Sequence, residues 1–152
     1  MAVAPIPAGY HSVTPYLVLR DAAAAMEFYK KAFGATELYR LTGPDGKVAH
    51  GEVKIGDSPV MLGEEMDGYC GPEAIGGTPV SLMIYVPDVD RVFAQALAAG
   101  AKEQRPVADQ FYGDRSGTLV DPFGHVWSIA THVEDVASEE IGRRFAKMTQ
   151  GS

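Results

Sequence analysis

The sequence predicts an α+β fold in which two tandem βαβββ modules form a curved mixed sheet around a cleft. Three observations predict it. Apolar periodicities and turn residues give the order strand, helix, strand, strand, strand twice along the 152 residues. Matching landmarks keep a nearly constant separation, since Asp88 follows Asp21 by 67 residues and Gly100 follows Gly34 by 66. A glycine-rich joint separates the copies, so the pattern indicates duplication of one unit.

The first module is predicted over residues 13–65, after an N-terminal arm of residues 1–12 that contains Pro and Gly. Asp21 and Gly34 are an N-cap and a C-cap around a helical apolar pattern. Strand patterns precede and follow this helix: Tyr16–Leu19, Glu37–Leu41, Val48–Ile55 and Pro59–Gly63. Gly-Pro-Asp-Gly at 43–46 separates two of these strands with a strong turn signal.

The second module is predicted over residues 79–132, after a linker of residues 66–78. Asp88 or Asp90 begins its helix and Gly100 ends it. Its strands are expected at Ser81–Val86, Glu103–Val107, Arg115–Val120 and His125–Thr131. One module leaves an open sheet edge, whereas two modules can pair edges into a larger sheet whose concave side forms a ligand cleft.

Residues 133–152 are expected to form a C-terminal helix and tail. Ser138 followed by two glutamates is typical of a helix start, and an apolar stripe follows at helical spacing: Ile141, Phe145 and Met148. We expect this stripe to pack on the body of the protein or on a second subunit.

Composition narrows the class of partner. The net charge of −7 argues against nucleic acid and anionic membranes, because both need a basic surface, and it tolerates a cationic ligand. No apolar run approaches the ~20 residues of a membrane span. The first residues lack the basic and apolar regions of a signal peptide. The single cysteine, Cys70, excludes an intramolecular disulfide, so we expect a cytoplasmic protein.

Two motifs carry a resemblance to a known family. The order of elements, FYKKAFGA at 28–35 and DPFGHVWSI at 121–129, resembles the vicinal oxygen chelate superfamily. That group includes glyoxalase I, extradiol dioxygenases, fosfomycin-resistance enzymes and bleomycin-binding proteins. The resemblance covers about residues 12–132, and within the group the chain looks most like PhnB-like, glyoxalase/bleomycin-resistance proteins. It implies the glyoxalase/bleomycin-resistance/dioxygenase fold and a homodimer whose modules pair across subunits.

The resemblance also implies a divalent metal held by His and Glu on the first and last strand of each module. Counting residues along the chain from the motifs places those positions at Thr14 and Ser81 on the first strands, and at Met61 and Ser128 on the last strands. Hydroxyl and thioether groups are poor ligands for such cations, which prefer imidazole nitrogen and carboxylate oxygen. We therefore expect the pocket without the metal, and no cofactor.

His50 and Glu52 are two residues apart on a predicted strand, so they share one face. Val53 and Ile55 alternate with Glu52 and are expected to face the helix. Three interpretations of the pair stay open: a hydrogen-bonding or acid–base pair in the pocket, an exposed polar face, or a displaced metal site.

The loop at 110–115 is dense in aromatic and polar groups, and loops on a scaffold often carry binding residues. Tyr112 could stack on a ligand. Arg115 could pair with an anionic ligand or, equally, form an internal pair with Asp114. Trp127 is expected in the core. The candidate ligand-binding residues are His50, Glu52, Met61, Ser81, Tyr112, Arg115 and Ser128.

The sequence thus predicts a homodimeric protein that binds a small organic molecule in the manner of the bleomycin-binding branch, without the usual metal. Two alternatives stay open. One is a metal-dependent lyase, isomerase or transferase of the glyoxalase or fosfomycin-resistance type, which the four missing ligands oppose. The other is a metal-free enzyme with Glu52 as base and Tyr112 or Arg115 as electrophile. Fold alone does not decide among them.

Overall fold

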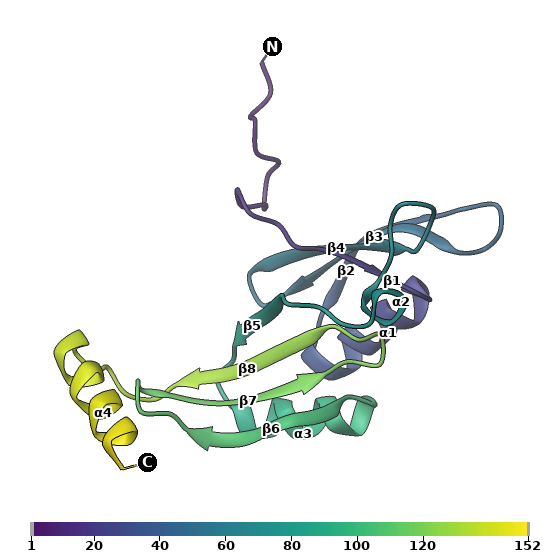
Figure 1. Cartoon of the computed structure of the whole chain (residues 1–152). Helices are drawn as coiled ribbons and strands as arrows, with labels where there is room; N and C mark the ends of the chain where they lie inside the picture. The colour runs from purple at the N-terminus through teal and green to yellow at the C-terminus, as the bar shows by residue number, and fades with distance from the viewer. Residues whose placement is uncertain (1, 152) are drawn as a thin grey trace.

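The computed structural model describes residues 2–151 and confirms an α+β fold of two βαβββ modules (Figure 1). The first module consists of β1 (Tyr16–Leu19), α1 (Ala22–Phe33), β2 (Thr36–Thr42), β3 (Val48–Ile55) and β4 (Ser58–Glu64). The second consists of β5 (Ser81–Tyr85), α3 (Val89–Ala99), β6 (Lys102–Asp109), β7 (Asp114–Val120) and β8 (Val126–His132). The chain ends in α4 (Ser138–Gln150), as the helix-start signal at Ser138 predicts.

The linker between the modules is more ordered than its glycine content predicts. It holds a short helix, α2 (Pro72–Ile75), with Pro72 in the first turn and Gly76 as a left-handed C-cap. Proline suits the first turn because its missing N–H would have no helical partner there. The sequence also left two N-caps open for α3, and the structure shows that Asp88 accepts from the Arg91 N–H at 3.1 Å.

The strands form two four-stranded sheets, with the orders β1-β4-β3-β2 and β5-β8-β7-β6. In each sheet the first and last strands of the module pair in parallel and the other neighbours are antiparallel. The predicted joining of both modules into one curved sheet is not seen within the chain. The reason is that the modules meet through their helices: α1 packs on α3, and the Gln95 amide donates to the Ala32 carbonyl at 3.0 Å.

A buried carboxylate fastens the two modules together. Asp121, 4% exposed, accepts hydrogen bonds from the Tyr29 hydroxyl at 2.6 Å and the Trp127 indole N–H at 2.9 Å. It also accepts from the backbone N–H groups of Phe123 and His125, at 2.9 and 3.0 Å. Tyr29 belongs to α1 and the other residues belong to the β7–β8 turn and β8. The two motifs that carry the family resemblance therefore meet at one carboxylate.

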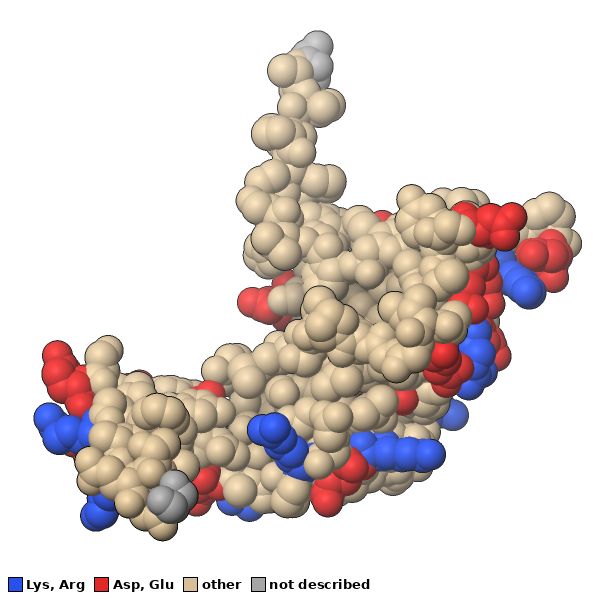
Figure 2. Space-filling view, in the orientation of Figure 1, with Lys and Arg blue, Asp and Glu red and all other residues tan. Residues whose placement is uncertain are grey.

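Because α1 packs on the first sheet and α3 packs on the second, each sheet has one face covered by a helix and one open face (Figure 1). Leu17, Leu19, Val53 and Leu62 are buried on the covered face of the first sheet. Large apolar side chains that remain about half exposed line the open faces: Tyr16, Tyr39 and Leu41 on the first sheet, and Met83 and Tyr85 on the second. Much of the centre of the surface in Figure 2 carries no Lys, Arg, Asp or Glu.

The N-terminal arm runs away from the body of the protein (Figure 1). No helix within residues 2–151 is long and apolar enough to cross a membrane.

Candidate functional site

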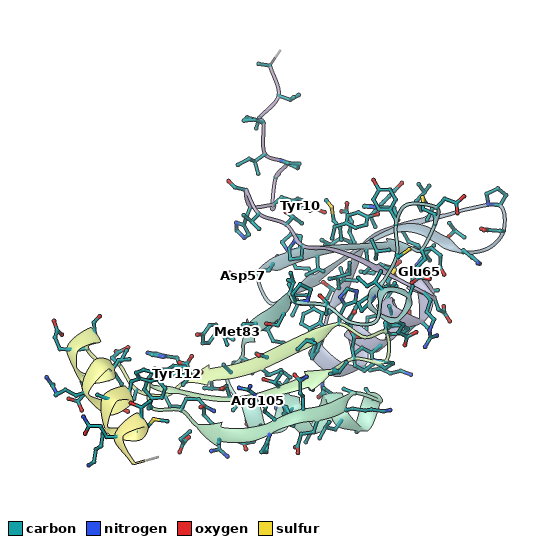
Figure 3. All side chains as sticks on the ribbon, viewed as in Figure 1. Tyr10, Asp57, Glu65, Met83, Arg105 and Tyr112 are labelled. Carbon is teal, nitrogen blue, oxygen red and sulfur yellow. The ribbon has the colours of Figure 1, made fainter. Side chains whose placement is uncertain are left out.

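Four polar side chains form one hydrogen-bonded chain on the open face of the first sheet, and we call them the first-sheet cluster. They are Tyr10, Tyr16, His50 and Glu52. His50 Nε2 lies 3.0 Å from Glu52 Oε1, and the Tyr16 hydroxyl lies 3.1 Å from His50 Nδ1. The Tyr10 hydroxyl donates to the other oxygen of Glu52. Figure 3 shows Tyr10 where the arm meets this sheet.

Strand geometry brings these groups together. β3 lies between β2 and β4, and its alternation buries Val53 and Ile55 while His50 and Glu52 face outward, as the sequence predicts. Tyr16 reaches His50 by lying over Gly63. A Cβ atom at position 63 would stand 2.7 Å from the Tyr16 hydroxyl, closer than real contacts allow. Glycine at this strand position is therefore required for the Tyr16–His50 contact.

The cluster holds a charged carboxylate in a largely covered position. The Glu52 side chain is 16% exposed and that of His50 is 26% exposed. Burial pushes the pKa of Glu52 upward, but hydrogen bonds from Tyr10 and His50 outweigh burial, so its pKa lies below the ordinary value. The same hydrogen bond, with burial, raises the pKa of Tyr10 to about 12.

The hydrogen-bond pattern fixes the direction of the chain. An ionised carboxylate only accepts, so the proton between His50 and Glu52 is carried by His50 Nε2. A neutral His50 then accepts at Nδ1 from the Tyr16 hydroxyl. The cluster thus offers hydrogen-bond acceptors and a negative charge, and it can hold a proton at His50 Nε2.

Met61 lies beside this cluster, as the cross-strand neighbour of both Glu52 and Tyr16. The structure therefore brings the candidate residues His50, Glu52 and Met61 together, and it adds Tyr10 and Tyr16, which the sequence analysis missed. The alternation of Tyr16 with buried Leu17 and Leu19 is a signal that could have found Tyr16. No local pattern could have found Tyr10, because its partner is 42 residues away.

Ser81 and Ser128 lie in the other sheet. The Ser128 hydroxyl is 3.2 Å from that of Thr118 on β7, and Met83 is the cross-strand neighbour of Ser128 on β5. Ser81 lies at the start of β5, opposite Val126. Both serines therefore sit on strands of the second module, apart from the first-sheet cluster.

The residues at the metal positions of the family do not fit a divalent metal. Thr14 precedes β1, two residues before Tyr16, which lies opposite Met61; Ser81 lies two residues before Met83, which lies opposite Ser128. None of these groups is an imidazole, carboxylate or thiolate. Within residues 2–151 no group of three or more His, Cys, Asp or Glu side chains is placed to hold a metal ion.

The two candidate residues of the loop at 110–115, Tyr112 and Arg115, lie at different places in the structure. Tyr112 lines a pocket beside the start of α4, together with Tyr85 and His132 (Figure 3). Arg115 points to the opposite face of the second sheet, where it pairs with Asp90 at 2.8 Å and Asp109 at 3.2 Å. Of the two roles left open for Arg115, the structure shows the internal pair, with these aspartates and not Asp114. Arg115 does not join the open-face residues.

With this geometry in hand, the chain can be compared with known proteins. The family model of the Glyoxalase/Bleomycin resistance protein/Dioxygenase superfamily matches residues 10–129. The chain belongs to this superfamily. An uncharacterized protein of Mycobacterium bovis is 43% identical over 145 residues, which cover 92% of this chain and 95% of that protein.

Solved structures agree with the superfamily fold. TioX from Micromonospora sp. ML1 is 26% identical with a TM-score of 0.64, and the match covers 84% of this chain and 100% of TioX. A PhnB protein from Bacillus cereus is 20% identical with a TM-score of 0.63, covering 80% of this chain and 99% of that chain. The second similarity shows the fold alone. The family model confirms the predicted resemblance to this superfamily.

Proposed function

We propose that this superfamily member binds a small organic molecule on the open face of the first sheet, and that its ligand is cationic or rich in hydrogen-bond donors. One observation carries the proposal: the Glu52 carboxylate is ionised and 16% exposed on a face that also carries half-exposed apolar and aromatic side chains. A charge held away from water is costly unless it is paired. Tyr10 and His50 supply part of that pairing, and a ligand donor supplies the rest.

A second copy of the chain would complete the site. The half-exposed Tyr16, Tyr39 and Leu41 on one sheet, and Met83 on the other, lie on faces that no other part of the described chain covers. Burying apolar area contributes about 25 cal/mol per Å², so association of such faces is favourable. A closed two-fold dimer is the commonest way to pair equal surfaces.

Recognition in this proposal needs no metal, because the positions opposite each other on the paired strands hold Tyr16, Met61, Met83 and Ser128. The same residues oppose a metal-dependent lyase, isomerase or transferase.

A metal-free enzyme is the second candidate, and the Tyr16–His50–Glu52 chain favours it. A carboxylate that orients a histidine is the arrangement that general acid–base catalysis uses. In such an enzyme His50 would accept a proton from Tyr16 or from the substrate. Tyr112 and Arg115 of the same chain would not serve as the electrophile within this cluster, since they lie in the second module.

The test of binding is a thermal-shift screen of paired cationic and neutral compounds on the wild type and on Glu52→Gln. A ligand present at 100 times its Kd stabilises the folded state by about 2.7 kcal/mol. We expect cations to raise the melting temperature of the wild type and to raise that of Glu52→Gln much less.

The matched control is Glu103→Gln, which removes the same charge from β6 in the other sheet. Equal stabilisation of wild type and Glu52→Gln by every cationic compound would contradict the proposal. Turnover of a bound compound that Glu52→Gln and His50→Gln both abolish would favour the enzyme instead.

A further inference from the structure

The pocket that Tyr112 lines, of about 520 Å³, lies where the second sheet meets the start of α4. Its polar wall consists of Tyr85, Tyr112, Asp114, His132 and Asp135, and Ile141 of α4 adds an apolar side. Figure 3 shows Tyr112 beside α4, away from Tyr10. This pocket is formed by other strands than the first-sheet cluster, so what it binds is a separate question.

His132 lies between two carboxylates at this pocket. Its Nδ1 is 2.8 Å from Asp114 Oδ1, and its Nε2 is 2.7 Å from Asp135 Oδ1. The two partners differ in how firmly they are held. The Asp114 side chain is 6% exposed, and its second oxygen accepts from the Tyr85 hydroxyl at 2.8 Å. Asp114 is therefore a fixed partner that orients the imidazole ring.

Asp135 is a replaceable partner. Its side chain is 100% exposed, and it lies on the short segment between β8 and α4 that has no regular structure. Exposed ion pairs contribute only ~0–1 kcal/mol, so rotating this side chain into water costs little. The released His132 Nε2–H would then be an unused donor at the edge of the pocket.

We propose that this pocket binds a small aromatic carboxylate, which replaces Asp135 at His132 Nε2. Asp135 itself shows that a carboxylate oxygen fits at hydrogen-bonding distance from this nitrogen. Asp135 stays in the chain and keeps its charge when it turns away, so binding adds one negative charge, which the charged imidazole of His132 offsets locally. The rings of Tyr85, which is 61% exposed, and Tyr112 provide aromatic surface for the ring of the ligand.

The site should bind best when His132 is charged. The groups that face it are Asp114 from β7, Tyr85 from β5, Tyr112 from the turn before β7, and Asp135. Hydrogen bonds to Asp114 and Asp135 raise the pKa of His132 above its ordinary value of 6.5. Affinity for a carboxylate should therefore fall as the pH rises through that raised pKa.

Benzoate is the probe, and NMR of the His132 ring is the readout, at about pH 6, where histidine is largely protonated. Benzoate should shift the His132 signals in a saturable way, and benzylammonium should not. Asp135→Asn removes the internal competitor, so we expect it to tighten benzoate binding about two- to five-fold, the equivalent of ~0.5–1 kcal/mol. His132→Gln should weaken binding at least about ten-fold.

Asp109→Asn is the control for a change of net charge, since Asp109 is an exposed partner of Arg115 on the other face. If Asp135→Asn tightens binding no more than Asp109→Asn does, the competitor role is wrong. If benzoate leaves the His132 signals unmoved, or binds His132→Gln equally well, the proposal is overturned. Glu52→Gln should leave benzoate binding intact, which separates this test from that of the proposed function.

Discussion

The Tyr29 hydroxyl should contribute measurably to the stability of the whole protein, because it joins the two modules. Tyr29 is fully buried on α1, and its hydroxyl donates to the buried Asp121 at 2.6 Å. Tyr29→Phe keeps the ring and its packing and removes only this hydrogen bond. Hydrogen bonds to charged groups contribute about 1.5–3 kcal/mol. Asp121 would keep three donors, so we expect a loss within this range.

In a domain of this size, 1 kcal/mol corresponds to about 2–4 °C in Tm, so Tyr29→Phe should lower Tm by about 3–12 °C. Urea unfolding and thermal unfolding of both proteins measure the loss. Tyr39→Phe is the matched control, because Tyr39 is half exposed on the open face. It should change stability by less than about 0.5 kcal/mol.

Asp121→Ala should destabilise the protein far more than Tyr29→Phe does. It removes the acceptor from the Tyr29 hydroxyl, the Trp127 indole and two backbone N–H groups, each of which costs about 1–3 kcal/mol when left unpaired. The total approaches the ~5–15 kcal/mol that holds a typical domain folded. If Tyr29→Phe proved as stable as Tyr39→Phe, and Asp121→Ala still folded normally, the buried carboxylate would not be what joins the modules.

Three further predictions follow from particular contacts. Hydrogen bonds to Asp114 and Asp135 raise the pKa of His132, so the stabilising contribution of His132 should be complete below pH 6.5 and lost as the pH rises through the raised pKa. Chemical denaturation of the wild type and of His132→Gln across this pH range measures that contribution. If the free energies of unfolding of the two proteins changed with pH in the same way, the prediction would be wrong. Tyr10→Phe should raise the pKa of Glu52, as an NMR titration of the carboxyl carbon would show, because it removes a hydrogen bond that lowers this pKa. Gly117→Ala should destabilise the second module by about 1–3 kcal/mol, because the added Cβ atom would stand 2.8 Å from the Phe93 ring. If urea unfolding of the variant matched that of the wild type, the Phe93 ring would be free to move aside.

The fold could be predicted closely because its signals are local. Caps and turns act within a few residues: Asp21 and Gly34 begin and end the first helix as predicted, and Asp88 is one of the two N-caps predicted for the second. The same holds for the alternation of β3, which placed His50 and Glu52 on the outward face. The duplication was visible because both modules repeat these local signals at a nearly constant separation.

The composition of the site could be predicted only in part, because its contacts join distant segments. Tyr10 reaches Glu52 across 42 residues, and Tyr16 reaches His50 across 34. Arg115 finds Asp90 across 25 residues, where the sequence suggested its neighbour Asp114. Asp114 instead forms hydrogen bonds with Tyr85 and His132. Nothing in the order of residues fixes which of several nearby aspartates an arginine reaches, since that depends on which face of a strand each side chain takes.

The register explains how a face of this fold can recognise a ligand without chelating a metal. The cross-strand partners Tyr16 and Met61 offer no ligand for a hard cation, yet Glu52 is the neighbour of Met61 on the next strand. The charged group of the face thus lies one strand away from the position where the resemblance implies a metal ligand. There it is held by Tyr10 and His50, which are hydrogen-bond donors. A ligand can add further hydrogen-bond donors to this carboxylate, so the face favours recognition by hydrogen bonds and charge. Ligand binding should therefore survive treatment of the protein with metal chelators.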